Sequence, residues 1–340
     1  MHPHIAVATV DDKPVVVIAM AESPLKPVSY RDRAYVRSGA TTRIASDHEL
    51  TRWVLERSGQ TWDELAEPRA SWEDVDLAAI ARFRRLCLDK GRRAIPADEP
   101  DDTVLRKLGL MADGSPTRAG LLLFGKEPQR LYASAFVRIG RFRSETDVVD
   151  DRLIRGNVFA QIEGAMTYFR ERLQTRYEFR GEPAREVIWE YPLEALREAM
   201  VNAVCHRDYL DPAHLQVRWF DDRIVVVNPG GLVPPLRPED LRGPHPSRPR
   251  NKRIAEALFD AGWIEQWGSG FEKMLRACGE AGLPEPEWEE RAGAFWLSFR
   301  RDILTEDHLR TIGLNERQVR AVASQPRVIC RNESSREALL

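Results

Sequence analysis

The segment that most constrains the fold of this chain is LEALREAMVNAVCHRDY, residues 193–209. Its apolar side chains recur with helical spacing, which predicts an amphipathic helix packed on a core. Glu198, Asn202 and His206 follow one another at intervals of four residues, so they share one face of that helix. A polar stripe of this kind is most often a solvated surface. A carboxylate and an amide one turn apart can also orient water and hold a hard cation, and the helix alone leaves both interpretations open.

Two strand patterns and two glycine motifs follow this helix. Residues 215–220 alternate between apolar and polar, and residues 223–227 predict a second strand that ends in Asn-Pro-Gly-Gly at residues 228–231. A long loop rich in Pro, Gly and Arg then leads to Gly-Ser-Gly at residues 268–270, which opens another helix. Glycine lets a backbone approach a flat base, and the N–H groups at a helix start attract phosphate. Each motif alone is also typical of an ordinary turn or cap.

The loop between the two glycine motifs is locally basic. Its cationic side chains, with one histidine, are Arg237, Arg242, His245, Arg248, Arg250, Lys252 and Arg253. Arginine and lysine in this place can neutralise a triphosphate, because their charged groups pair with phosphate oxygens. A surface loop, or a contact to nucleic-acid phosphates, explains the same residues equally well.

The composition excludes several classes of protein. With 340 residues and 43% apolar side chains, the chain is long enough for two or three domains. Its net charge of -2 supplies no overall field for nucleic acid, so any DNA contact needs a local patch. The four cysteines contain no CxxC pair, which argues against a zinc site or a disulfide framework. No signal peptide and no membrane-spanning run is apparent, so we expect a cytoplasmic protein without a membrane partner.

The rest of the chain predicts a scaffold around the polar helix. The periodicity favours helices at residues 48–56, 75–90, 101–108, 158–173 and 251–261. The β-branched and alternating stretches favour strands at residues 5–10, 15–21, 33–39, 135–139 and 295–299. Two short helical patterns at residues 304–312 and 316–322 are typical of the start of a helix-turn-helix unit. Neither a GxGxxG dinucleotide motif nor a P-loop is present, which argues against both of those nucleotide folds.

The order of the motifs resembles that of the Bergerat nucleotide fold of the GHKL ATPases. More narrowly, the chain resembles the divergent GHKL-type domain of a bacterial family of Schlafen/AlbA-containing transcriptional regulators, often described as helicase-related. The stretches that carry this resemblance are REAMVNAVCHRDY, DDRIVVVNPGGL, SRPRNKRIAEAL and IEQWGSGFEKM. They cover residues 191–300 closely. PTRAGLLLFGKEPQ at residues 116–129 resembles the connecting region of that family, and PVSYRDRAYVRSGATTR at residues 27–43 resembles the end of its Schlafen/AlbA module.

The resemblance implies an ATP site that uses Mg²⁺. It implies Glu198 as the residue that orients or activates water, and Asn202 as a ligand of the Mg²⁺ that bridges phosphate oxygens. Asn228 falls where many relatives have an adenine-reading Asp, and its amide oxygen can still accept from the adenine amino group. The expected cofactor-binding residues are Asn202, Asn228, Gly230, Gly231, Arg250, Gly268 and Gly270. The resemblance implies no firm role for His206.

We therefore expect an α+β protein in four parts. Residues 1–50 are expected to be a partial Schlafen/AlbA-type module, and residues 51–185 a mixed helical and strand connector. Residues 186–301 are expected to form a GHKL-like ATP-binding domain, an α/β sandwich with a mixed or antiparallel sheet. Residues 302–340 are expected to be an incomplete helix-turn-helix-like tail. The first half of the Schlafen/AlbA module and a complete winged helix are absent from the pattern.

Two functions of different kinds remain open at this stage. The first is an ATP-binding transcriptional regulator that hydrolyses ATP slowly or not at all, and whose nucleotide state arranges flanking DNA-binding modules. The second is a non-enzymatic DNA-binding regulator in which the GHKL-like domain is a degenerate scaffold. Nucleic-acid processing by the Schlafen/AlbA module is a third and weaker alternative, and a homo-oligomer is left open.

Overall fold

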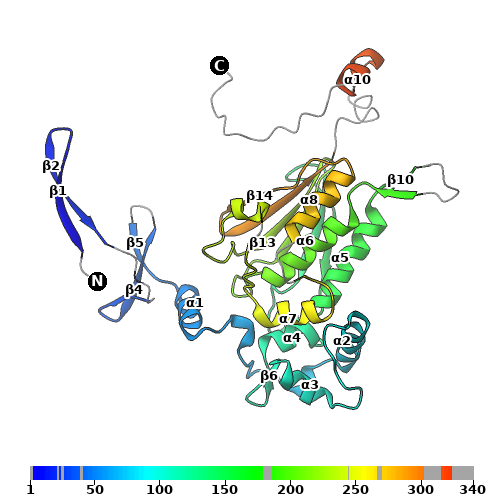
Figure 1. Cartoon of the computed structure of the whole chain (residues 1–340), viewed down its shortest axis with the longest axis horizontal. Coiled ribbons are helices and arrows are strands. Elements are labelled where there is room, and N and C mark those ends of the chain that lie inside the picture. Colours follow the sequence, from blue (N-terminus) through cyan, green and yellow to red (C-terminus); the bar gives the residue numbers. More distant parts are fainter. Residues whose placement is uncertain are drawn as a thin grey trace.

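The computed structural model describes residues 3–20, 23, 27–38, 41–178, 186–243, 245–265, 270–301 and 315–323. Its centre is a mixed β-sheet with helices packed on one face (Figure 1). A helical layer covers one end of this sandwich, and a set of small strands lies apart from it at the N-terminal side. The predicted α+β class is confirmed.

The central sheet has six strands in the order β14-β15-β13-β12-β8-β9. In chain order these are β8 (Val137–Phe142), β9 (Val148–Ile154), β12 (Leu215–Trp219), β13 (Arg223–Pro229), β14 (Glu287–Arg291) and β15 (Ala294–Arg300). β12 pairs with β8 in parallel, whereas the other neighbours are antiparallel. Ile224 and Val226 of β13 belong to the main core, and Val225 and Val227 belong to a smaller apolar cluster, as alternation along a strand requires.

Three helices pack against the sheet and against each other: α5 (Val158–Arg172), α6 (Leu193–His206) and α8 (Gly270–Glu280). α6 lies between the other two and buries the apolar face that its sequence predicts, including Leu196, Met200 and Val204. Its polar stripe is therefore turned away from the core, toward the space between α8 and the end of β13. The helix that most constrains the fold thus also positions the candidate site.

The helical layer at one end consists of α2 (Leu77–Lys90), α3 (Asp101–Lys107), α4 (Arg118–Phe124) and α7 (Lys252–Asp260). α4 is buried along its whole apolar run from Leu121 to Phe124. The Thr117 hydroxyl caps it by accepting a hydrogen bond of 3.1 Å from the Gly120 N–H. A two-residue ladder, β6 (Met111–Ala112) with β7 (Ser115–Pro116), precedes it.

The N-terminal strands form two small sheets. β1 (His4–Val10) and β2 (Lys13–Ala19) make an exposed hairpin, and β3 (Ser29–Tyr30), β4 (Arg33–Ser38) and β5 (Thr41–Ile44) make a second sheet. α1 (Asp47–Ser58) connects them to the main body (Figure 1). The remaining described elements are β10 (Thr175–Glu178), β11 (Glu186–Trp189), α10 (Glu316–Ala323) and single 3₁₀ turns at Trp62–Glu64, Trp72–Asp74, Pro128–Arg130 and Pro238–Arg242.

The sheet includes strands from outside residues 186–301, the range expected for the sandwich. β8 and β9 lie within residues 51–185, and β8 pairs with β12 in the middle of the sheet. β9 has no counterpart among the expected strands. This parallel pairing joins segments that are far apart in the chain, so a local sequence pattern does not predict it. Residues 304–312, a predicted helix, lie outside the described residues, while residues 316–322 correspond to α10.

Within the described part of the chain, none of the helices has the length and apolar character needed to cross a bilayer.

Candidate functional site

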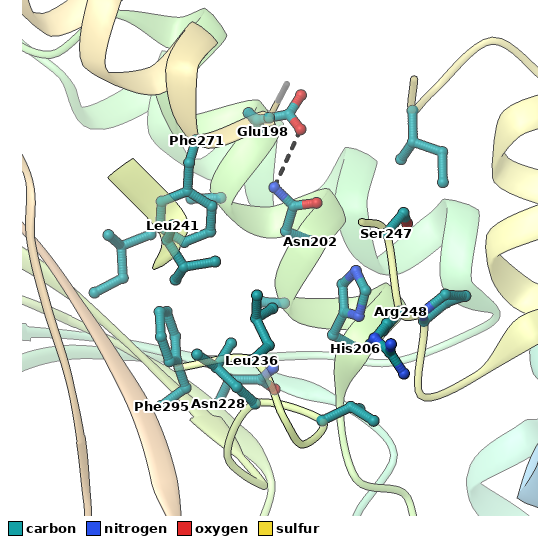
Figure 2. A pocket seen from close by; sticks show the side chains of 18 of the residues that line it. Glu198, Asn202, His206, Asn228, Leu236, Leu241, Ser247, Arg248, Phe271 and Phe295 are labelled. Atoms are coloured by element: carbon teal, nitrogen blue, oxygen red, sulfur yellow. Dashed lines mark hydrogen bonds between the residues drawn. The ribbon is translucent and has the colours of Figure 1, made fainter. Parts of the chain in front are cut away.

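A pocket opens between the polar face of α6, the end of β13 and the start of α8 (Figure 2). Six of the residues singled out in the sequence line it: Glu198, Asn202, Asn228, Gly230, Gly231 and Gly270. They come from three elements separated by long stretches of chain. The fold therefore brings the predicted residues to one cavity. Gly268 lies in residues 266–269, outside the described residues.

Glu198 and Asn202 form a hydrogen-bonded pair at one end of the pocket. The Asn202 amide nitrogen donates to Glu198 Oε1 at 3.1 Å (Figure 2). The carbonyl oxygen of Asn202 is then the atom left to face a cation or a ligand. Burial raises the pKa of Glu198 above its ordinary value, although the bond from Asn202 and the nearby charges of Lys273 and Arg197 oppose the shift. A carboxylate with a raised pKa is suited to accept a proton from water.

Gly270 lets α8 begin directly against this pair. A β-carbon built on Gly270 would lie 2.3 Å from Glu198 Oε1 and 2.9 Å from Asn202 Nδ2. A larger residue could not take this place unless the pair moved. The N-terminal end of a helix carries partial positive charge, so its position beside the carboxylate favours a negatively charged ligand there.

An apolar wall forms one side of the pocket, and Phe271 of this wall directly follows Gly270 at the start of α8. Its aliphatic and aromatic side chains are Val226, Leu236, Leu241, Phe271, Met274, Phe295 and Leu297. Phe271 and Phe295 meet edge to face, with ring centroids 6.0 Å apart and an interplanar angle of 88°. Surfaces of this kind accommodate flat, weakly polar rings.

Asn228 is the polar group embedded in that wall. It is 6% exposed, and its Oδ1 is buried without a hydrogen-bond partner among the described residues. Buried side-chain oxygens nearly always have a partner, so this atom has hydrogen-bonding capacity to spare. The side chain lies at the edge of the pocket in Figure 2. It is suited to read the polar edge of a bound ring.

Arg250 holds the end of β13 rather than lining the pocket. Its Nη2 donates to the Gly231 carbonyl at 2.6 Å, and its Nε donates to the His206 carbonyl at 3.2 Å. Gly230 beside it has a φ of 88°, and a β-carbon there would lie 2.7 Å from the Asp208 Cβ. The structure therefore places Arg250 behind the pocket. Its expected contact with a nucleotide stays a prediction.

His206 completes the stripe of α6 and also lines the pocket. Burial lowers the pKa of His206 to about 4, and the charges of Arg250 and His245 act in the same direction. The imidazole is therefore neutral at physiological pH. The next residues are structural: the buried Arg207 donates to the Ala213 carbonyl at 2.7 Å, and the Tyr209 hydroxyl donates to the Val204 carbonyl at 3.0 Å.

Several lining residues were not singled out as site residues by the sequence. Ser247 and Arg248 line the pocket from the loop before α7, and Phe271 and Phe295 belong to its apolar wall. Arg248 belongs to the basic stretch of that loop, but nothing in the spacing distinguishes it from its neighbours. Phe271 directly follows the second glycine motif, which is the signal that could have identified it.

The oxygen atoms in the pocket suit a metal ion that takes most of its ligands from water and substrate rather than from the protein. Among the described residues, no group of three or more His, Cys, Asp or Glu side chains could hold a metal ion. The Asn202 carbonyl supplies a hard oxygen ligand, as Mg²⁺ requires. Mg²⁺ usually retains several waters and binds substrate phosphates, so one or two protein oxygens are sufficient.

Comparisons with known proteins match two regions of the chain. Residues 213–299 match the family described as "Putative ATP-dependent DNA helicase recG C-terminal", and residues 52–138 match a domain of unknown function, DUF8451. The crystal structure of the DIP2311 protein from Corynebacterium diphtheriae has a similar fold, with a TM-score of 0.58 and 23% identity. The match covers 88% of this chain and 59% of that one. None of the curated proteins matches.

The range that matches the helicase-related family includes most of the strands and the α8 helix that line the pocket, but not α6. Residues 213–299 contain β12, β13, β14, α7, α8 and all but the last residue of β15, with the glycine motifs. They begin after α6, so they do not include Glu198 and Asn202. Residues 213–299 of the chain are thus similar to a helicase-related, ATPase-like domain.

Proposed function

We propose that this chain binds ATP together with Mg²⁺ in the pocket between α6, β13 and α8, and hydrolyses it slowly. The observation that carries the proposal is the convergence of a carboxylate–amide pair, an unpartnered buried Asn228 oxygen and an aromatic wall on one cavity. The similarity of residues 213–299 to an ATPase-like domain supports the same ligand class.

The proposed orientation follows from the chemically different sides of the pocket. The base would lie against Phe295 in the apolar wall, where Asn228 can accept from an exocyclic amino group (Figure 2). The phosphates would face Asn202 and the start of α8, because backbone N–H groups and a hard oxygen ligand gather there. Arg248, which lines the pocket from the loop before α7, supplies a positive charge there.

Glu198 is the proposed general base. Its raised pKa lets it take a proton from a water molecule that attacks the terminal phosphate. Asn202 would hold both this carboxylate and the metal in place. Mg²⁺, when bound, would neutralise negative charge on the phosphate oxygens.

As a wider role we propose a transcriptional regulator in which the bound nucleotide arranges flanking segments that contact DNA. The description of the matched family as a DNA helicase region supports a connection with DNA. The Schlafen/AlbA-type resemblance of residues 27–43 supports the regulatory role.

A calorimetric titration with ATP, ADP and a non-hydrolysable ATP analogue, with and without Mg²⁺, tests the proposal. Asn202→Ala is expected to lose most of the Mg²⁺-dependent affinity, about tenfold or more. Glu194→Gln is the matched control, because Glu194 is exposed one turn earlier on the same helix. Equal ATP affinity of the wild type and Asn202→Ala, with or without Mg²⁺, would remove the basis of the assignment.

A non-enzymatic regulator with a degenerate scaffold is the second candidate. Two observations favour it: Asn228 stands where an acidic residue is expected, and Arg250 binds backbone carbonyls instead of facing the cavity. Under this alternative, millimolar ATP leaves the melting temperature unchanged. A salt-dependent gel shift with DNA would then be insensitive to ATP.

A further inference from the structure

One buried carboxylate links α1 to the pocket. Asp208 is 5% exposed and lies directly behind Gly230. Its Oδ2 contacts Arg52 Nη2 in a short ion pair, and it lies 3.4 Å from His48 Nε2. Both of these partners belong to α1, outside residues 213–299, the range similar to an ATPase-like domain.

The same Asp208 oxygen is shared with a residue that holds the pocket. Arg250 Nη1 lies 3.5 Å from Oδ2. The other nitrogens of this guanidinium donate to the Gly231 and His206 carbonyls. Gly231 and His206 both line the pocket. Three consecutive contacts therefore lead from Arg52 to the pocket wall.

The charges make the position of Arg250 depend on α1. Asp208 is buried, and a buried carboxylate requires a cationic partner. With Arg52 in place, Arg250 Nη1 lies 3.5 Å from Asp208 Oδ2 while Nε and Nη2 donate to the two carbonyls. Without Arg52, Arg250 is the guanidinium that remains to compensate Asp208. Its guanidinium would be drawn toward the carboxylate, away from Gly231 and His206.

We propose that Arg52 is a positioning residue of the pocket, which acts through Asp208 and Arg250 on the backbone at Gly231 and His206. Docking of α1 and binding of the ligand then strengthen each other. This proposal rests on the proposed nucleotide site for the identity of the ligand. The coupling itself rests on the contacts among these residues. By linkage, the two effects must be equal in magnitude.

The first experiment needs no ligand. Amide hydrogen exchange at residues 230–233 is compared among the wild type, Arg52→Ala and Arg57→Ala. Arg57 is the matched control, because it is an exposed arginine in the last turn of the same helix. We expect faster exchange in Arg52→Ala alone. Unchanged exchange in Arg52→Ala would overturn the proposal, whatever the ligand.

The second experiment measures the affinity for a non-hydrolysable ATP analogue. Arg52→Ala is expected to bind it about fivefold more weakly, whereas Arg52→Lys recovers part of the loss and Arg57→Ala binds as the wild type does. In Asp208→Asn, the additional change Arg52→Ala should have little effect, because the shared charge is already absent. Equal affinities of the wild type and Arg52→Ala contradict the coupling. If neither the wild type nor any variant binds the analogue, but hydrogen exchange in Arg52→Ala is faster as expected, the nucleotide assignment fails. The coupling between α1 and the pocket still stands.

Discussion

The carboxylate of Asp63 accepts a hydrogen bond of 3.0 Å from the backbone N–H of Ile254, a residue 191 positions further along the chain. It accepts a second bond of 2.9 Å from the Arg253 N–H, so it caps the first turn of α7 from a distant segment. The Thr61 hydroxyl donates to its other oxygen at 2.6 Å. The residues before α7 line the pocket, so this cap fixes one end of the loop that borders the site.

Asp63 should make stability depend on pH. Burial raises its pKa to about 6, against about 3.9 in the unfolded chain. The folded state therefore binds this proton more tightly, and the corresponding stability is complete below about pH 4 and is lost as the pH rises through about 6. Relative to Asp63→Asn, the wild type should lose about 2–3 kcal/mol of unfolding free energy across that range. Urea denaturation at successive pH values measures this loss.

Asp113→Asn is the control for this measurement, because Asp113 is exposed in a turn. It should leave the pH profile of the wild type unchanged. A constant difference between the wild type and Asp63→Asn at every pH would show that the carboxyl of Asp63 does not titrate in this range.

Gly270→Ala should impair binding much more than stability. The new methyl group meets the far end of the Glu198 side chain, which can rotate away and separate from Asn202. We expect about tenfold weaker binding of the ATP analogue, because small misplacements in a site are costly. Gly279→Ala on the same helix meets nothing within 4 Å and should stabilise the protein by about 0.5–1 kcal/mol without affecting binding. Calorimetry and thermal melts distinguish the two variants, and equal affinities would contradict the role of Gly270.

Glu198→Gln should abolish turnover while ATP remains bound. Glutamine keeps the size of the side chain and its contact with Asn202, but it cannot accept the proton from water. Loss of a general base lowers the turnover rate by about 10²–10⁴. In the wild type, turnover should also fall as the pH drops through the raised pKa of Glu198, since only the ionised form is a base. Phosphate release assays measure both effects, with Glu194→Gln as the active control.

Gly230→Ala should be among the more damaging single substitutions. It forces a side chain into a φ of 88° and brings its β-carbon to 2.7 Å from the Asp208 Cβ. Gly114→Ala has nearly the same backbone strain, with a φ of 79°, but meets nothing within 4 Å. We expect a loss of about 1 kcal/mol for Gly114→Ala and about 3 kcal/mol or more for Gly230→Ala. Similar losses in chemical denaturation would mean that the contact with Asp208 is unimportant.

Local patterns account for most of the elements but not for their assembly. The apolar spacing of residues 193–209 predicts α6, which ends three residues earlier at His206, and the alternation of residues 215–220 predicts β12 within one residue. The pairing of β8 with β12 is different, because it joins strands that α5 and α6 separate in the sequence, and so it does not follow from any local pattern. The three-dimensional structure is therefore needed to assign β8 to the same sheet as β12.

The candidate site likewise combines features that the sequence predicts with features that depend on distant neighbours. Glu198 and Asn202 share a helix, so their contact follows from a spacing of four residues. The direction of Arg250 depends on a choice among side-chain rotamers, which is decided by Asp208 and two backbone carbonyls that the sequence does not place beside it. The pKa of His206 is likewise lowered because the fold buries the imidazole, with Arg250 nearby. Long-range neighbours, and not residue types, determine these properties.

The place of β15 in the sheet has a consequence for synthesis of the chain on the ribosome. β15 lies between β13 and β14, and its Phe295 and Leu297 form part of the pocket wall. Until residue 300 leaves the exit tunnel, β13 has an open edge where β15 will pair, and the cavity has no floor on that side. The wall of the pocket is therefore completed late in synthesis. A nascent chain halted before β15 would display an unpaired apolar strand.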